Sequence, residues 1–156
     1  AQKSPAAYEA VCQRLHTASL RTVVIGPDPR LTAKSVVGIL DTLDVRWALL
    51  VGDRMGGELA WELAATRLDR FIGLVVIDRG HPRVADLAGV VRDEHCPPVE
   101  LNTTALVSTS ASRAVAKASQ QFVYGEYRIV DLLGRRNVAD STAQLAAEIV
   151  MRTSTW

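Results

Sequence analysis

Apolar residues recur along the chain in two alternating patterns. Short continuous apolar runs rich in β-branched side chains predict buried strands, at 20–26, 46–52, 71–78, 103–110 and 127–134. Between these runs, apolar residues spaced three and four apart predict amphipathic helices, at 32–44, 57–70, 84–94, 112–123 and 141–153. A further helix is predicted at 4–17, with Ser4 as its cap and Pro5 at its first position.

The order of these elements predicts an α/β fold, a parallel sheet sandwiched between two layers of helices. Strand and helix alternate five times, and the strands lack the polar alternation of a sheet with one face in water. With 156 residues, no repeat and no linker, the sequence predicts one domain over residues 1–156. Ligands of such sheets bind at the carboxyl ends of the strands, so we look for function in the loops that follow them.

Composition narrows the class of protein. The net charge of +1 arises from 18 basic and 17 acidic residues without a basic patch, so no nucleic-acid partner is predicted. No apolar run approaches the roughly 20 residues that span a bilayer, and the first residues lack the apolar core of a signal peptide. We therefore expect a cytoplasmic protein with no membrane partner. Cys12 and Cys96 have no metal-type spacing, and neither a metal nor another cofactor is predicted.

The stretch LLVGDRMGG, residues 49–57, has the outline of a strand that turns sharply into a helix. Gly52 and Gly56 allow close passage of the backbone at such a turn, and Gly57 allows the helix to pack tightly on the sheet. Enzymes built this way display a Ser, Cys or Asp nucleophile at the corner, where this chain has Arg54. A guanidinium group, with a pKa above about 12, is neither a nucleophile nor a base.

Residues 40–78, LDTLDVRWALLVGDRMGGELAWELAATRLDRFIGLVVID, resemble the α/β-hydrolase superfamily. They are similar to its helix, nucleophile strand, elbow helix and following strand, and the resemblance runs over nearly the whole chain. A family member commonly reads V-G-H-S-M-G-G where this chain reads V-G-D-R-M-G-G. The resemblance implies a parallel sheet between helices and, in a typical member, hydrolysis by a Ser-His-acid triad.

Laid on that pattern, all three triad positions hold other residues. The family's Ser falls on Arg54, preceded by Asp53, and its His falls on Arg136 within GRRNV. Its acid falls near Ser112 in STSAS, which offers no carboxylate. The resemblance therefore implies the fold of a hydrolase without its catalytic groups.

Two classes of function remain open. The first is a non-catalytic protein that binds a small anion, such as a carboxylate, through Asp53, Arg54, Met55 and Arg136 near the start of the helix at 57–70. In the simpler alternative, Arg54 pairs with Asp53, or Arg136 pairs with Asp131 or Asp140, and fills the vacated site. The second is a hydrolase with a relocated site that uses Asp53, Cys96 or His81, with His81 as its base. A nucleophile and a base within about 3 Å of each other would distinguish the two classes.

The sequence also predicts association with another chain. Members of the family begin with further strands, one of which would lie between the runs at 20–26 and 46–52. Three explanations are open for the missing strand. The sheet is rebuilt, another chain supplies a strand, or the sequence lacks an N-terminal piece. Exposed strand edges invite pairing, so we expect a homo-oligomer or a partner chain that completes the sheet. Trp47 and Trp61 are predicted to pack in the core or against the crossovers.

Overall fold

The computed structural model describes residues 9–26, 28–132 and 138–153, with side chains of the last segment described from residue 142. Four strands form one parallel sheet in the order in which they occur: β1 (Ala48–Asp53), β2 (Phe71–Ile77), β3 (Thr103–Val107) and β4 (Tyr127–Asp131). The helices are α1 (Glu9–Thr17), α2 (Ala33–Thr42), α3 (Met55–Thr66), α4 (Ser110–Ser119) and α5 (Val138–Thr153), with a short 3-10 turn at Gln120–Phe122.

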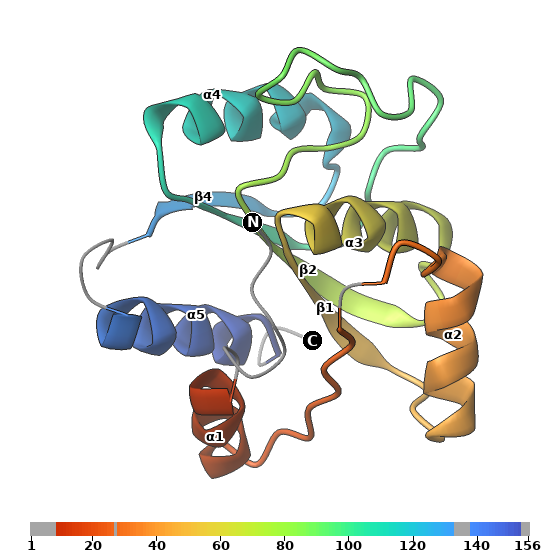
Figure 1. The fold of residues 1–156 in the computed structure, drawn as a ribbon, viewed down its shortest axis with the longest axis vertical. Coiled ribbons are helices and arrows are strands. Elements are labelled where there is room, and N and C mark those ends of the chain that lie inside the picture. The colour runs from red at the N-terminus through yellow and green to blue at the C-terminus, as the bar shows by residue number, and fades with distance from the viewer. Residues whose placement is uncertain (1–8, 27, 133–137, 154–156) are drawn as a thin grey trace.

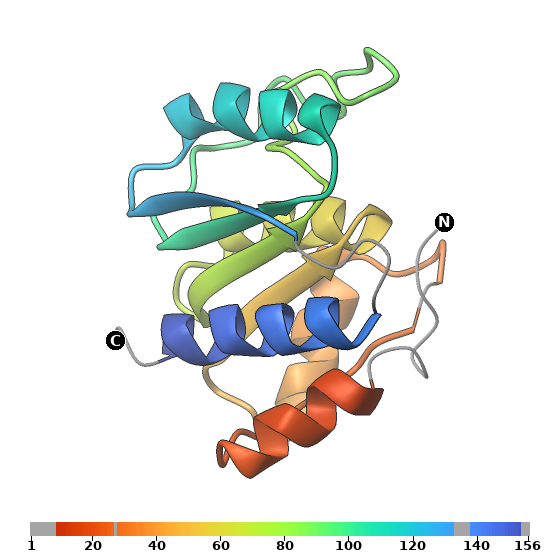
Figure 2. The same cartoon turned by 90° about the vertical axis from the view of Figure 1, so that its left-hand side faces the viewer.

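Two layers of helices cover the sheet (Figures 1 and 2). Leu74 and Val76 of β2 belong to an apolar cluster with α2, α3 and α4, whereas Val75 and Ile77 belong to a second cluster with α1 and α5. Successive residues of a strand point to opposite faces, so a strand buried on both faces must be apolar throughout. The predicted α/β sandwich is confirmed.

The prediction of a strand at 20–26 is wrong. Among the described residues, the main chain of 21–26 forms no hydrogen bond with β1. Leu20 packs against the cluster of α1 and α5, and Ile25 packs against that of α2 and α3, so this segment passes from one helix layer to the other. β-branched residues favour an extended chain, but an extended chain forms a strand only when its main chain bonds to a neighbouring strand.

The prediction of a helix at 84–94 is also wrong, because these residues form a loop. The Asp86 carboxylate accepts hydrogen bonds from the main-chain N–H groups of Ala88 and Val90, at 2.9 and 3.0 Å. Gly89 follows with φ of +80°, a conformation outside the helical region. Local bonds from an Asp side chain to the backbone compete with the helix here.

The two tryptophans that were expected to pack lie in different environments. Trp61 of α3 is fully buried, as predicted, whereas the side chain of Trp47 is 58% exposed. Trp47 immediately precedes β1, an outer strand of the sheet, so no neighbouring strand covers it. In the part of the chain that the structure describes, no helix has the length and apolar character needed to cross a membrane.

Candidate functional site

The corner between β1 and α3 has the sharp geometry that the sequence predicts. Arg54 stands at the corner with φ of 52° and ψ of −107°, and its main-chain N–H donates to the carbonyl of Ile77 at 2.9 Å. A Cβ atom on Gly52 would lie 2.6 Å from Cα of Gly57, and one on Gly57 would lie 2.8 Å from Cβ of Arg79. Both glycines are therefore required by the close approach of strand, turn and helix.

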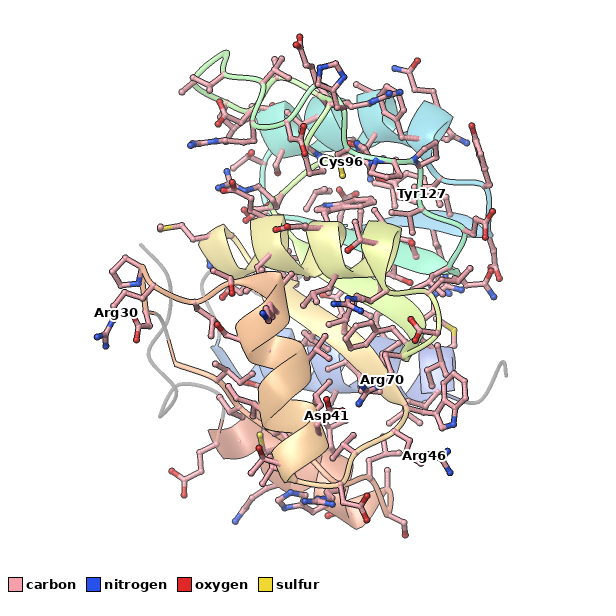
Figure 3. The ribbon with its side chains drawn as sticks, turned by 90° about the vertical axis from the view of Figure 1, so that its right-hand side faces the viewer. Arg30, Asp41, Arg46, Arg70, Cys96 and Tyr127 are labelled. Atoms are coloured by element: carbon pink, nitrogen blue, oxygen red, sulfur yellow. The ribbon has the colours of Figure 1, made fainter. Side chains whose placement is uncertain are left out.

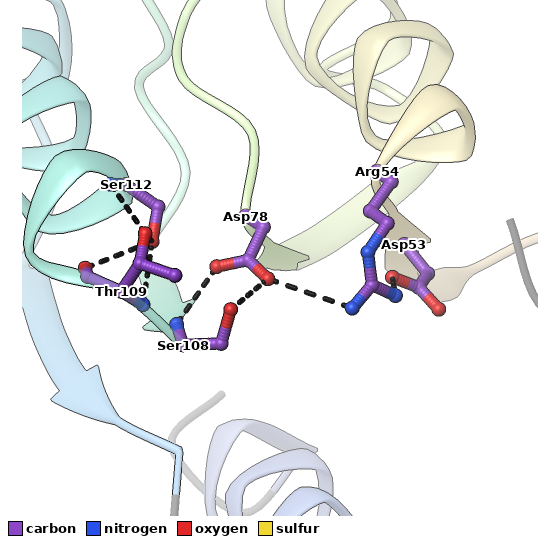
Figure 4. A network of polar contacts seen from close by, with 6 residues as sticks. All are labelled: Asp53, Arg54, Asp78, Ser108, Thr109 and Ser112. Carbon is purple, nitrogen blue, oxygen red and sulfur yellow. Dashed lines mark hydrogen bonds and ion pairs between the residues drawn. The ribbon is translucent and has the colours of Figure 1, made fainter. Parts of the chain in front are cut away.

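The Arg54 side chain lies between two carboxylates (Figure 4). Its Nη1 donates to Oδ1 of Asp53 at 2.7 Å, and its Nη2 lies 3.6 Å from Oδ2 of Asp78. The carboxylate side chains are 5% and 10% exposed, whereas that of Arg54 is 36% exposed. The pairing of Arg54 with Asp53, one of the two alternatives from the sequence, is present in the structure.

Asp78 is the site residue that sequence reasoning missed. It directly follows β2 with φ of 53°, and its carboxylate accepts from the N–H and the hydroxyl of Ser108, at 2.8 and 2.5 Å. These contacts extend the network from β1 and β2 to the end of β3 (Figure 4). The available signal was a carboxylate at the carboxyl end of the run 71–78, the same edge as the corner. We name Asp53, Arg54, Asp78 and Ser108 the corner network.

Two other predicted site residues, Ser112 and Met55, do not join the corner network. Ser112 is buried in the first turn of α4, where its hydroxyl accepts from the Thr109 N–H and donates to the Thr109 carbonyl. This is a capping box, which satisfies the backbone at the start of the helix. Met55 is 68% exposed beside Arg54. Arg136 lies outside the described residues.

The contacts of His81 favour a structural role over that of a relocated base. The imidazole is buried against Trp61 and Phe122, and its Nδ1 accepts from the Arg83 N–H at 3.1 Å. Its Nε2 therefore carries the proton and donates to the Pro97 carbonyl at 2.8 Å. Burial lowers the pKa of His81, because the charged form loses its hydration. Both nitrogens are thus occupied by the main chain.

Cys96 also has the properties of a core residue (Figure 3). Its thiol is buried, and burial raises its pKa to about 11, so it stays protonated at neutral pH. Among the described residues, no serine or cysteine is hydrogen-bonded to an imidazole, and no three His, Cys, Asp or Glu residues are placed to hold a metal ion.

A cavity of about 220 Å³ adjoins the corner network through Asp78. Residues from the end of β2, the loop at 84–94 and the start of α4 line it: Asp78, Arg79, Gly80, Asp86, Leu87, Ala88, Arg92, Ser112 and Val115. Arg92 pairs with Asp86 at 3.0 Å, and Arg79 pairs with Glu58 outside the lining at 3.3 Å. Nε of Arg79 is buried and has no acceptor among the described residues. The cavity combines both signs of charge with a small apolar wall.

Comparison with known proteins identifies the fold. No family model matches the chain, and no curated protein matches it by sequence. NosK from Streptomyces actuosus matches with a TM-score of 0.66 and 18% identity, over 96% of this chain and 91% of that chain. The α/β-hydrolase domain-containing protein 10 from mouse matches with a TM-score of 0.61 and 13% identity, over 92% and 82%. This chain has an α/β-hydrolase fold.

At these low sequence identities, a structural match shows the fold of the chain. A structure from work on carboxylesterases of the thaumarchaeon Nitrososphaera gargenis also matches, with a TM-score of 0.59 and 10% identity, over 96% of this chain and 87% of that chain. An α/β-hydrolase fold hosts many activities, so the function of this chain has to be argued from its own site.

Proposed function

We propose that this chain is a non-hydrolytic α/β-hydrolase-fold protein that binds a small carboxylate-bearing ligand at the carboxyl edge of its sheet. The observation that carries the proposal is Arg54, held between Asp53 and Asp78 at the corner where the fold presents a nucleophile. A guanidinium group cannot attack an acyl carbon, and here it pairs with two carboxylates that are nearly buried.

The remaining nucleophiles near this edge support the absence of hydrolysis. Acyl transfer needs a hydroxyl or thiol activated by a neighbouring base. The Ser108 hydroxyl donates to Asp78, whose carboxylate also lies 3.6 Å from the Arg54 guanidinium. Cys96 stays protonated, and the nitrogens of His81 bond to the main chain. Among the described residues, neither of these nucleophiles is therefore paired with an imidazole base.

The cavity beside Asp78 supports a small ligand with a carboxylate and a hydrogen-bond donor. Its volume of about 220 Å³ is below the range of pockets for drug-sized molecules, so an amino acid or a compound of similar size fits better. Arg92, whose side chain is partly exposed, is available to a ligand carboxylate, while Asp86 and Asp78 are suited to an ammonium or hydroxyl group. The anion contact is placed on Arg92 rather than on Arg54, whose charge is offset by two carboxylates.

Thermal denaturation with matched ligands tests the binding. A panel of amino acids, the corresponding amines and the corresponding simple carboxylates is added separately to the protein. We expect amino acids or carboxylates to raise the Tm, since a ligand at 100 times its Kd stabilises the folded state by about 2.7 kcal/mol. Arg92→Met removes the shift, whereas Arg113→Met, at an ion pair with Asp131 outside the cavity, retains it. Shifts caused by the amines alone would contradict the proposed ligand class.

Turnover of short-chain p-nitrophenyl esters tests the absence of hydrolysis. We expect wild-type protein to release nitrophenol no faster than buffer. Turnover that disappears in His81→Ala or Cys96→Ala, with the variant still folded by circular dichroism, would establish the relocated active site instead.

A further inference from the structure

β1 is an outer strand of the sheet with the composition of an inner one. Residues 48–52 are apolar or glycine throughout, and within the described residues β1 pairs only with β2. Leu49 and Leu50 pack on opposite faces of the sheet but are only partly buried, and Val51 is 40% exposed. Among the described residues, no strand pairs with the second edge of β1, which is flanked by these apolar side chains.

The other outer strand, β4, is protected in the usual way. Charged side chains on edge strands discourage pairing with other chains. β4 carries Arg128 within it and follows directly on Glu126, and Arg128 pairs with Glu148 of α5. No charged residue interrupts β1 between Trp47 and its last residue, Asp53. This difference indicates that β1 is the edge adapted to a neighbour.

A cavity of about 380 Å³ opens at the amino end of β1. The residues that line it come from the end of α2 and the segments that precede β1 and β2: Asp41, Asp44, Val45, Arg46, Trp47, Asp69 and Arg70. Three carboxylates and two guanidinium groups leave one negative charge in excess. The strongly exposed indole of Trp47 adds an aromatic face to this acidic lining.

Arg70 is already used by the protein (Figure 3). Its Nη1 pairs with Asp41 at 2.7 Å, its Nη2 donates to the Val45 carbonyl at 2.8 Å, and its Nε donates to the Arg46 carbonyl at 3.1 Å. These bonds hold the wall of the cavity in place. The carboxylates of Asp44 and Asp69 are left to contact a bound group. Arg46 is the one other positive charge in the lining.

We propose that an extended segment of a partner protein adds to the free edge of β1 and places a Lys or Arg side chain in this cavity. Main-chain bonds along β1 supply affinity, as in other cases of strand addition, and alternate apolar side chains cover Val51. The cation meets Asp44 and Asp69 and can stack on Trp47. The proposal is independent of the ligand site, which lies at the opposite end of the strands.

Charge argues for a different chain rather than a second copy. Two copies related by a two-fold axis would pair their β1 strands antiparallel, with the amino end of one beside the carboxyl end of the other. The segment next to each cavity would then be 51–54, whose only cation, Arg54, is held by Asp53 and Asp78. The described segment 51–54 of a second copy therefore supplies no free basic side chain at that point, whereas a partner with a Lys or Arg there does.

Selection from a phage-displayed library of random nonapeptides identifies what the edge binds. The library is panned on the wild-type protein and counter-selected on Val51→Lys, which places a charge on the edge at an exposed position. We expect enriched peptides to alternate apolar and polar residues and to carry a Lys or Arg towards one end. Trp47→Ala weakens binding of an enriched peptide about threefold to fivefold, the scale of an exposed cation–π contact.

Further measurements make the outcome decisive. Glutamate in place of the peptide's basic residue is expected to abolish binding, and the bound peptide is expected to shift the amide NMR signals of residues 48–52. Circular dichroism checks that Val51→Lys is folded; if it is not, these amide shifts replace the counter-selection as the test of the edge. Three results would each overturn the proposal: no enrichment on wild type over Val51→Lys, enrichment indifferent to charge, or a wild-type dimer in light scattering that Val51→Lys dissociates.

Discussion

Charged residues lie at both ends of β1. Those at the carboxyl end pair with one another, whereas some of those at the amino end are accessible. At the carboxyl end, the charged side chains of the corner network pair with one another, and both of its carboxylates are nearly buried. At the amino end, Arg70 secures the loops while Asp44, Asp69 and Trp47 stay accessible in an open cavity. Charges used internally define the shape of a protein, whereas accessible charges are available for recognition. Substitutions at the carboxyl end should therefore change stability, and those at the amino end should change binding.

Among the changes at the two ends of β1, Gly52→Ala should have the largest effect on stability. The new Cβ would lie 2.6 Å from Cα of Gly57 and 2.7 Å from the Gly56 carbonyl oxygen, and neither main-chain atom can move without displacing α3. We expect a loss of about 3 kcal/mol in the free energy of unfolding, at the upper end of overpacking costs. Urea denaturation measures it. Gly38→Ala in α2 is the control, because nothing lies within 4 Å and alanine favours a helix by about 0.5–1 kcal/mol.

Arg54→Met should be the next most costly change. It leaves Asp53 and Asp78 nearly buried without their cation, and we expect a loss of roughly 2 kcal/mol, below the cost of breaking a fully buried pair because Arg54 is partly exposed. Arg30→Met removes an exposed ion pair with Asp28 and should leave the free energy of unfolding almost unchanged. If the corner depends on the Arg54 cation, removing one carboxylate as well should restore part of the lost stability. The double variant Arg54→Met/Asp53→Asn tests this. Equal stability of Arg54→Met and wild type would show that the corner does not depend on this charge.

The elements at the carboxyl end could be predicted because their signals are local. The apolar run before Gly52 and the glycines after Arg54 lie within a few residues, and each reflects a constraint on the same turn. The pairing of Arg54 with Asp53 was foreseen for the same reason, since the two residues are adjacent. Asp78 and Ser108 were not foreseen as its partners, because their contacts depend on how β2 and β3 align beside β1.

The amino end could not be predicted, because exposure there depends on which strands are neighbours. The segment 20–26 has the composition of a strand, yet among the described residues its main chain forms no hydrogen bond with β1. Trp47 was expected to pack because tryptophan is usually covered, and its exposure follows from the position of β1 at the edge. Local sequence carries no information on that position.

Lowering the pH should destabilise the folded protein through His81. Its pKa is lowered in the folded protein, so the unfolded chain binds more protons below its ordinary pKa of about 6.5. Stability should accordingly be complete above that pH and fall as the pH drops through 6.5 towards the folded pKa, by up to about 1.4 kcal/mol per pH unit. Urea denaturation across this range measures the slope. His81→Gln should flatten it, while His95→Gln, at a strongly exposed histidine, should not.

Trp47→Ala should have the smallest effect on stability and thereby sharpens the contrast between the ends. Most of the indole is in water, so little buried apolar area is lost, and we expect a change below about 0.5 kcal/mol in urea denaturation. Trp61→Ala is the matched comparison: its indole is fully buried and donates to the Arg79 carbonyl at 3.1 Å, and its loss should cost about 3–5 kcal/mol. A cost above 1 kcal/mol for Trp47→Ala would mean that Trp47 supports the fold. A negligible cost, together with weaker binding of a basic peptide, would show that Trp47 serves recognition at the edge of β1 rather than stability of the fold.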